Sequence, residues 1–187
     1  VKRLQNTDFQ IKVKNLRLGA IVVSCKGESF EYTSFRKEVY SEGGNHIPKA
    51  VEATENVQED AQRRDFSVNA IYYNINKKKI VDCVGGTEDV KKRILRSVKN
   101  PDETMKNDGE RILRMVRFAG ELCFKIEKNT LVAAKKNIGN VADLQPKRKY
   151  LEIDRILYCD KKYSGKLKNL KYALSILNRL QIWTEFG

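Results

Sequence analysis

The first hundred residues show the alternation of apolar and polar positions that is typical of β-strands. Residues 9–13 alternate in this way, as a half-buried strand does. A short apolar run at 20–23 and a second alternating segment at 29–33 flank a turn at 26–28, which predicts a β-hairpin. The same reasoning predicts a loop at 41–49, a short helix at 58–63 and two further strands at 68–73 and 79–82.

From about residue 100 onward the apolar positions follow the spacing of helices. Pro101 suits a first helical turn, with Asn100 as its cap. The run Asn-Asp-Gly-Glu at 107–110 has the form of a capping box, and apolar residues follow it at helical spacing. Further helices are predicted near 128–137, 147–159 and 166–181. The pattern therefore predicts an α+β protein with a boundary near residue 100.

The composition favours a folded protein of the cytoplasm. Hydrophobic residues make up 41% of the 187 residues, which is enough for a sizeable core. No apolar run approaches the roughly 18 residues that a membrane-spanning helix needs, and no signal-peptide pattern opens the chain. The chain begins with Val1 and stops soon after Trp183 within a helical pattern, so we expect it to be cut at both ends.

The cysteines do not suggest a metal site. Cys25, Cys83, Cys123 and Cys159 are tens of residues apart, and His46 is the single histidine. Structural zinc sites use closely spaced pairs of such ligands. Reduced, mostly buried thiols are the expectation here.

The formal net charge of +13 favours a polyanionic partner. Such a charge attracts nucleic acid over long distances and makes the affinity sensitive to salt. The alternative is a lysine-rich surface that is merely solvated. Charge alone leaves both interpretations open.

A first charged run lies at 63–70, where Arg63 and Arg64 precede Asp65 and Asn69. Guanidinium groups match the geometry of phosphate oxygens, so the arginines suit a triphosphate. Asp65 and Asn69 offer groups that can hydrogen-bond a ribose 2′-hydroxyl. The alternative is an Arg–Asp salt bridge that packs a helix against a strand.

A second run places Asp108, Arg111, Arg114 and Arg117 at intervals of three residues. Residues three apart on a helix are neighbours, so these side chains form a stripe that winds slowly round the helix. Asp108 and Arg111 together offer an acceptor and several donors, which suits the Watson–Crick edge of cytosine or adenine. Arg114 and Arg117 suit phosphates. The alternative is a solvated face in which Asp108 favours the helix dipole.

Glu31 is a third candidate, on the predicted strand at 29–33. A two-metal site needs several carboxylates that converge on two cations, and one carboxylate does not make such a site. An ordinary strand glutamate is the alternative.

Taken together, these runs resemble the class II tRNA nucleotidyltransferase and bacterial poly(A) polymerase family. Residues 30–36 resemble the strand after its catalytic motif, and 63–70 resemble its ribose-selecting motif. Residues 82–86 resemble the turn that follows, and 108–124 resemble its base-selecting helix. The order and spacing of the motifs agree across residues 20–135.

The resemblance implies a fold and an activity. It implies a partial nucleotidyltransferase head with a mostly antiparallel β-sheet at 1–100, an all-α, nucleotide-selecting neck at 101–160, and the start of a helical, RNA-binding body at 161–187. The family transfers CMP and AMP from CTP and ATP to the 3′ end of tRNA without a nucleic-acid template, using two Mg²⁺ ions. Poly(A) addition, and a non-catalytic RNA-binding relative, remain alternatives. A nucleic-acid-binding protein without a nucleotide pocket is the remaining alternative.

The resemblance also implies roles for single residues. Arg64 would contact the triphosphate and Asp65 the ribose. Asp108 and Arg111 would read the base, and Arg114 and Arg117 would support nucleotide binding. Glu31 would be a candidate third carboxylate for the metal ions.

The chain departs from the family pattern at four places. The metal-binding Asp-x-Asp motif has no counterpart in residues 1–19, where Asp8 is alone, so we expect a truncated chain that is inactive by itself. Asn107 replaces a usual glutamate before the base-selecting aspartate. The segment 41–49, which corresponds to a loop involved in switching nucleotide specificity, is unusual. A later helix motif is recognisable only weakly, around Arg148 and Glu152.

Overall fold

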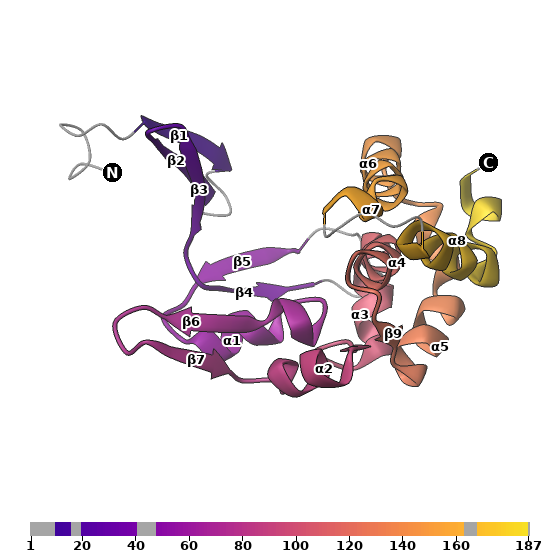
Figure 1. The fold of residues 1–187 in the computed structure, drawn as a ribbon, viewed down its shortest axis with the longest axis horizontal. Helices are drawn as coiled ribbons and strands as arrows, with labels where there is room; N and C mark the ends of the chain where they lie inside the picture. The colour runs from indigo at the N-terminus through magenta and orange to yellow at the C-terminus, as the bar shows by residue number, and fades with distance from the viewer. Residues whose placement is uncertain (1–9, 16–19, 41–47, 163–167, 187) are drawn as a thin grey trace.

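The computed structural model describes residues 10–15, 20–40, 48–162 and 168–186, and it shows a strand-rich part followed by a helical part (Figure 1). The strands are β1 (Gln10–Asn15), β2 (Ala20–Cys25), β3 (Glu28–Thr33), β4 (Arg36–Val39), β5 (Ala50–Ala53), β6 (Ile71–Asn74), β7 (Lys79–Asp82), β8 (Ile94–Leu95) and β9 (Lys125–Ile126). The α-helices are α1 (Val57–Gln62), α2 (Gly86–Lys92), α3 (Pro101–Asn107), α4 (Glu110–Leu122), α5 (Lys128–Lys136), α6 (Pro146–Leu157), α7 (Cys159–Lys162) and α8 (Lys168–Leu180). The short 3₁₀ helices within the described residues are η2 (Ser67–Asn69), η3 (Ile138–Val141) and η4 (Ile182–Phe186). The predicted α+β class is confirmed.

The strands of the first part pair antiparallel in separate small sheets. One sheet has the order β1-β2-β3, and the pairs β4-β5 and β6-β7 form two others. β2 and β3 meet at a tight turn in which Lys26 and Gly27 both have positive φ, at 52° and 83°. The predicted hairpin is therefore confirmed, and Figure 1 shows its sheet standing apart from β6 and β7.

The prediction of a strand over 68–73 is wrong at its beginning. Ser67–Asn69 forms the 3₁₀ helix η2, and β6 begins only at Ile71. The Ser67 hydroxyl donates to the Asp89 carboxylate at 2.6 Å, and the Ser67 amide donates to the carbonyl of Arg96 at 2.9 Å. These bonds to a distant segment hold the backbone in a turn, although the residue types favour a strand.

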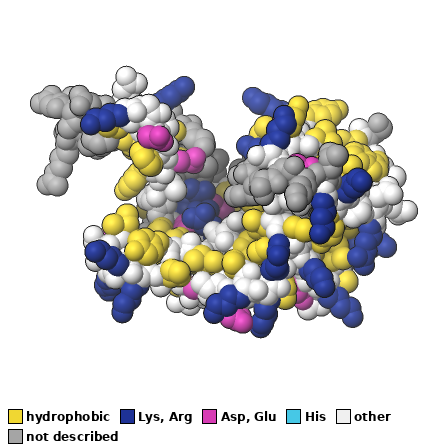
Figure 2. Space-filling model, viewed as in Figure 1, with side chains coloured by type: hydrophobic (Ala, Val, Ile, Leu, Met, Phe, Trp, Pro, Cys, Tyr) yellow, Lys and Arg dark blue, Asp and Glu magenta, His cyan; other side chains and the backbone are white. Residues whose placement is uncertain are grey.

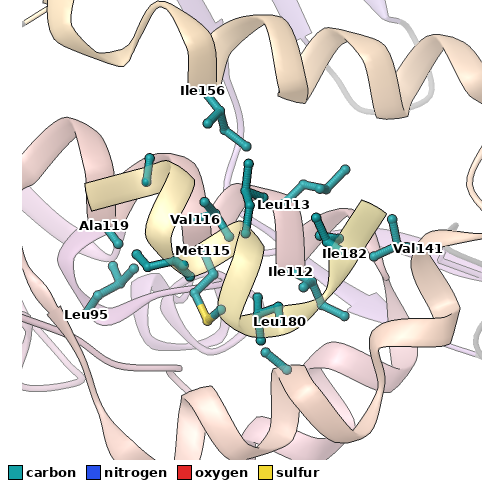
Figure 3. Close-up of a cluster of buried hydrophobic side chains, with 14 of the residues drawn as sticks. Leu95, Ile112, Leu113, Met115, Val116, Ala119, Val141, Ile156, Leu180 and Ile182 are labelled. Carbon is teal, nitrogen blue, oxygen red and sulfur yellow. The ribbon is translucent and has the colours of Figure 1, made fainter. Parts of the chain in front are cut away.

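The hydrophobic core is built around one face of α4. Ile112, Leu113, Met115, Val116 and Ala119 are all fully buried. Figure 3 shows these side chains meeting residues of the surrounding elements, which include Leu95, Val141, Ile156, Leu180 and Ile182. Because packing of this density leaves α4 little freedom to shift, the polar side chains on its other face are held in fixed positions.

The junction between α3 and α4 differs from the predicted capping box. Asn100 caps α3 as predicted, accepting from the amides of Asp102 and Glu103. Asp108 has an extended backbone between the two helices, and its carboxylate accepts from the Glu110 amide at 3.0 Å. The helix therefore begins at Glu110, and Asp108 rather than Asn107 satisfies its first amides.

The predicted boundary near residue 100 is crossed by two features. β8 pairs in parallel with β9, and Phe66 and Leu95 belong to the same buried cluster as the residues of α4. The division at residues 100 and 160 stays a prediction.

Some sequence-based expectations lie outside the described residues, including those on Asp8, Phe9, His46 and most of the loop at 41–49. All four cysteines fall within the described part of the chain and are free of disulfides. In that part, no helix has both the length and the apolar character to cross a membrane.

Gly86 tests the packing that positions η2. A β-carbon at Gly86 would lie 2.2 Å from the carbonyl oxygen of Ser67, whereas one at Gly139 would meet nothing within 4 Å. We expect Gly86→Ala to lower the free energy of unfolding by about 1–3 kcal/mol, because the backbone must shift. Gly139→Ala is the control, with a change of at most ~1 kcal/mol. Urea unfolding followed by circular dichroism measures both, and equal stability of the two variants would contradict this account.

Candidate functional site

A cavity of about 480 Å³ lies where the strand-rich part meets α4. Figure 2 shows the molecule hollowed between the strand-rich side and the helical side, with basic and acidic side chains gathered in the hollow. The cavity is lined by Arg36, Glu38, Arg63, Arg64, Asp65, Asn69, Asp108, Glu110, Arg111, Arg114 and Phe118. Six of the seven residues predicted to bind nucleotide are therefore brought to one place.

Asp60 organises the arginines on the α1 side of the cavity. It is fully buried and accepts from Arg64 through Nε at 3.1 Å and Nη2 at 2.8 Å, and from Arg63 Nε at 2.8 Å. The Tyr72 hydroxyl also donates to it, at 2.7 Å. Burial alone would raise the pKa of Asp60, but the hydrogen bonds from Tyr72 and Arg64 and the charges of both arginines lower it from 3.8 to about 2. Asp60 is thus a permanent anion that fixes the direction of two cations.

Sequence reasoning missed Asp60. A signal was present, because Asp60 precedes Arg63 by three positions and Arg64 by four, which is the spacing of neighbours on and just after a helix.

Asp65 joins the two charged runs of the sequence. Its Oδ2 accepts from Arg114 through Nε at 2.7 Å and Nη2 at 2.6 Å, and its Oδ1 accepts from the Phe66 amide at 2.8 Å and from Asn69 Nδ2 at 3.2 Å. Burial would raise the pKa of Asp65, but the charge of Arg114 and these hydrogen bonds hold it below its ordinary value. The salt bridge foreseen as an alternative for the first run is present, with Arg114 of the second run as the partner.

Arg148 of α6 orients Asp108 from the opposite side. Its Nη2 lies 3.2 Å and 3.1 Å from the two carboxylate oxygens of Asp108, and it also pairs with Glu110. Asn140 donates through Nδ2 to the carbonyls of Met105 and Lys106, both at 3.3 Å. These contacts fix the junction from which Asp108 projects.

Arg111 reaches back to the strand-rich part. Its Nη2 donates to the Tyr40 hydroxyl at 3.1 Å, and its Nη1 donates to the carbonyl of Thr104 at 3.3 Å. Tyr40 directly follows β4, and sequence reasoning did not single it out because the contact joins residues 71 positions apart.

Arg117 and Glu31 are not part of the cavity lining. Arg117 is buried, with Nε donating to Glu152 at 2.8 Å and Nη1 to Glu121 at 3.2 Å. Glu31 is exposed on β3, opposite Val22. The role of Arg117 in nucleotide binding and that of Glu31 as a metal ligand stay predictions.

A metal cage is not formed by the residues that the structure describes. Within them, no three His, Cys, Asp or Glu side chains come together as metal ligands do. The described carboxylates of the cavity are committed to arginines, so they do not fit the two Mg²⁺ ions that the family resemblance implies.

The sequence was also compared with protein families and with known proteins. The family model of the poly(A) polymerase head domain matches residues 1–96, just over half of the chain. The CCA-adding enzyme of Staphylococcus saprophyticus is 37% identical over 164 residues, which cover 84% of this chain and 39% of that enzyme. The CCA-adding enzyme of Lactobacillus helveticus is 38% identical over 122 residues, covering 65% of this chain and 30% of that enzyme. The chain thus spans less than half the length of these relatives.

Solved structures show the same fold. The Bacillus stearothermophilus CCA-adding enzyme in complex with CTP aligns with a TM-score of 0.78 and 27% identity, covering 92% of this chain and 39% of that one. A tRNA nucleotidyltransferase complexed with a primer tRNA and an incoming ATP analogue aligns with a TM-score of 0.75 at 22% identity, which shows the fold alone. The fold is that of a nucleotidyltransferase head joined to helices. The chain belongs to the class II CCA-adding enzyme and poly(A) polymerase family.

The buried position of Arg117 predicts an effect on stability. Arg117→Met leaves Glu152 and Glu121 buried with less compensation, so we expect a loss of about 3–5 kcal/mol in the free energy of unfolding. Arg155→Met is a matched control, because Arg155 pairs with the same Glu152 at 2.6 Å but is 47% exposed. That control should change stability by only about 0–1 kcal/mol. Chemical denaturation measures both, and a stable Arg117→Met variant would show that the buried pair contributes little.

Proposed function

We propose that this chain supplies the nucleotide-selecting part of an enzyme that adds CMP and AMP, from CTP and ATP, to the 3′ end of tRNA. The observation that carries the proposal is the gathering of Arg64, Asp65, Asn69, Asp108, Arg111 and Arg114 on one cavity. Relatives that are CCA-adding enzymes support it. Because the chain spans 39% of the first of these, the activity, substrates and partners belong to the whole protein.

The triphosphate is proposed to lie against Arg64. Two donors of its guanidinium are bound to Asp60, and the side chain remains 31% exposed. A guanidinium has five donors in a fixed fork, so the outward donors keep a defined direction toward the cavity. A cation aligned in this way suits phosphate oxygens of any nucleotide.

The ribose is proposed to contact Asp65 and Asn69. The two side chains are hydrogen-bonded to each other at 3.2 Å and both line the cavity. Asp65 is ionised, because its pKa is held below the ordinary value. A carboxylate accepts only, so it favours a sugar that can donate a 2′-hydroxyl over one that lacks it.

The base is proposed to be read by Asp108 and Arg111 on the helical side. Asp108 offers an acceptor that Arg148 holds in place, and Arg111 offers donors. Cytosine and adenine both present an amino donor beside a ring-nitrogen acceptor, which this pair complements. Uracil and guanine present a ring N–H at the corresponding position, and would face the donors of Arg111 with a donor of their own.

The reaction is proposed to be nucleotidyl transfer. The RNA 3′-hydroxyl attacks the α-phosphate, the bond between the α-phosphate and the bridging oxygen breaks, and pyrophosphate leaves. The family resemblance assigns activation of the nucleophile to Mg²⁺, for which the described residues offer no cage. What these residues do is bind and orient the nucleotide.

We place the protein in the cytoplasm, in keeping with four cysteines that are free of disulfides.

Incorporation of nucleotides tests the proposal. The protein encoded by the complete gene is incubated with tRNA that lacks its CCA end, and incorporation of labelled CTP and ATP is measured. We expect a product extended by a defined, short CCA sequence. Long A tails would identify a poly(A) polymerase instead. Retention of tRNA binding without any incorporation would leave a non-catalytic relative as the better interpretation.

Two substitutions test the division of roles within the cavity. In the 187-residue chain, Arg64→Ala should weaken the binding of CTP, ATP, UTP and GTP alike, because it removes a phosphate contact. Arg111→Ala should instead reduce the preference for CTP and ATP. Each change removes a hydrogen bond to a charged group, worth roughly 1.5–3 kcal/mol. Calorimetry with each triphosphate measures the effects, with Arg155→Ala, outside the cavity lining, as the control. Identical, base-independent losses for both variants would contradict the assigned roles.

A further inference from the structure

Tyr40 links the base-selecting helix to the strand-rich part through its hydroxyl group. It follows β4 directly, and the guanidinium carbon of Arg111 lies 5.3 Å from the centroid of its ring. Its hydroxyl lies 3.2 Å from Glu38 Oε2 and 3.1 Å from Arg111 Nη2. One tyrosine thus connects a carboxylate of the strand-rich part with an arginine of α4.

The direction of both hydrogen bonds is fixed by the partners. An ionised carboxylate can only accept, and a guanidinium can only donate. Tyr40 must therefore donate to Glu38 and accept from Arg111. Burial raises the pKa of Tyr40 to about 12, so the hydroxyl keeps its proton at neutral pH.

Glu38 is itself held rigidly. Its Oε1 accepts from Arg36 Nε at 2.9 Å and from Arg63 Nη1 at 3.1 Å, and its side chain is 7% exposed. The position of the Tyr40 hydroxyl is thus determined by contacts within the strand-rich part. The hydrogen bonds of Tyr40 to Glu38 and to Arg111 therefore fix where the Arg111 guanidinium of α4 lies relative to the strand-rich part.

Arg111 is anchored on one side by uncharged groups. Its hydrogen-bond acceptors within the described residues are the Tyr40 hydroxyl and the Thr104 carbonyl, whereas Arg64, Arg114 and Arg148 each bind a carboxylate. Two of its five donors are used in this way, and the side chain also lines the large cavity. Arg111 thus differs from these neighbours, each of which is held by a carboxylate.

A second cavity beside Arg111 offers space for another conformation of its side chain. This cavity, of about 70 Å³, is lined by Tyr40, Thr104 and Arg111, by the acids Glu38 and Glu103, and by the cations Arg63, Arg64 and Lys99, among other residues. Arg111 lines both cavities. Without the hydroxyl of Tyr40, a long flexible side chain beside a free volume would lose one of the two hydrogen bonds that fix its orientation.

We propose that Tyr40 is a specificity-determining residue that orients Arg111 toward the base of a bound nucleoside triphosphate. The selection of bases with a ring-nitrogen acceptor then depends on the strand-rich part as well as on α4. This inference rests on the proposed function, and it concerns discrimination between bases rather than affinity for the triphosphate. Tyr40 acts through Arg111 and contacts no reacting atom.

The test compares base preference with phosphate affinity. Calorimetry on the 187-residue chain measures the affinity for CTP, ATP, UTP and GTP with magnesium, and for inorganic tripolyphosphate. We expect Tyr40→Phe to reduce the preference for CTP over UTP by roughly tenfold, the effect of about one lost hydrogen bond. The affinity for tripolyphosphate should not change. Tyr73→Phe is the matched control, because Tyr73 is an exposed tyrosine on β6 that lines neither cavity.

The outcomes separate the inference from the function on which it rests. An unaltered chain that selects CTP and ATP, together with a Tyr40→Phe variant of equal selectivity, overturns the inference and leaves the function intact. Equal losses of tripolyphosphate and nucleotide affinity in the variant also overturn it, because they indicate a general structural role. An unaltered chain that binds no triphosphate, or binds all four equally, refutes the proposed nucleotide selection itself.

Discussion

The ion pair between Asp65 and Arg114 is the interaction on which the arrangement of the cavity depends. Arg114 projects from a helix whose opposite face is fully buried, and Asp65 is tied to the backbone of Phe66 and to Asn69. Both side chains are therefore held rigidly on separate segments. Because Arg114 meets Asp65 through two hydrogen bonds, the pair sets the distance between α4 and the segment that carries Asp65. This ion pair fixes α4 relative to the strand-rich part. The Glu38–Tyr40–Arg111 and Asp108–Arg148 contacts then orient single side chains between these two parts.

Pairing each cation with a carboxylate has a second effect in this cavity. Arginines left unpaired would repel one another and spread into solvent, and a ligand would then have to order them on binding. Here Asp60 and Asp65 order Arg64 and Arg114 through contacts within the protein itself, at the cost of reducing the net positive potential. Binding of the proposed triphosphate would therefore depend on the geometry of these arginines as well as on the overall charge.

Periodicity predicted the elements whose stability comes from a local pattern, namely the hairpin of β2 and β3 and the helices α4, α5, α6 and α8. It failed at Val68 and Asn69, which lie in the 3₁₀ helix η2, where the hydrogen bond from Ser67 to Asp89 holds the backbone in a turn. For the site, a spacing of three residues placed Arg111, Arg114 and Arg117 on one stripe, and Arg114 and Arg117 were both expected to contact phosphates. A helix advances about 100° per residue, so each step of three turns the side chain back by about 60°, and the third arginine faces the interior and Glu152. Tyr40 and Arg148 could not be found in this way, because their contacts join residues 71 and 40 positions apart.

The parallel pairing of β8 with β9 brings together segments that lie on either side of α3 and α4. Such pairs form slowly, because the entropy cost of closing the loop between the strands precedes the free energy gained from their contacts. The ion pair of Asp65 with Arg114 spans 49 residues, and that of Asp108 with Arg148 spans 40. During synthesis, Arg148 therefore cannot orient Asp108 until α6 has left the ribosome, and a nascent chain that stops before α6 carries Asp108 without the guanidinium that holds its carboxylate.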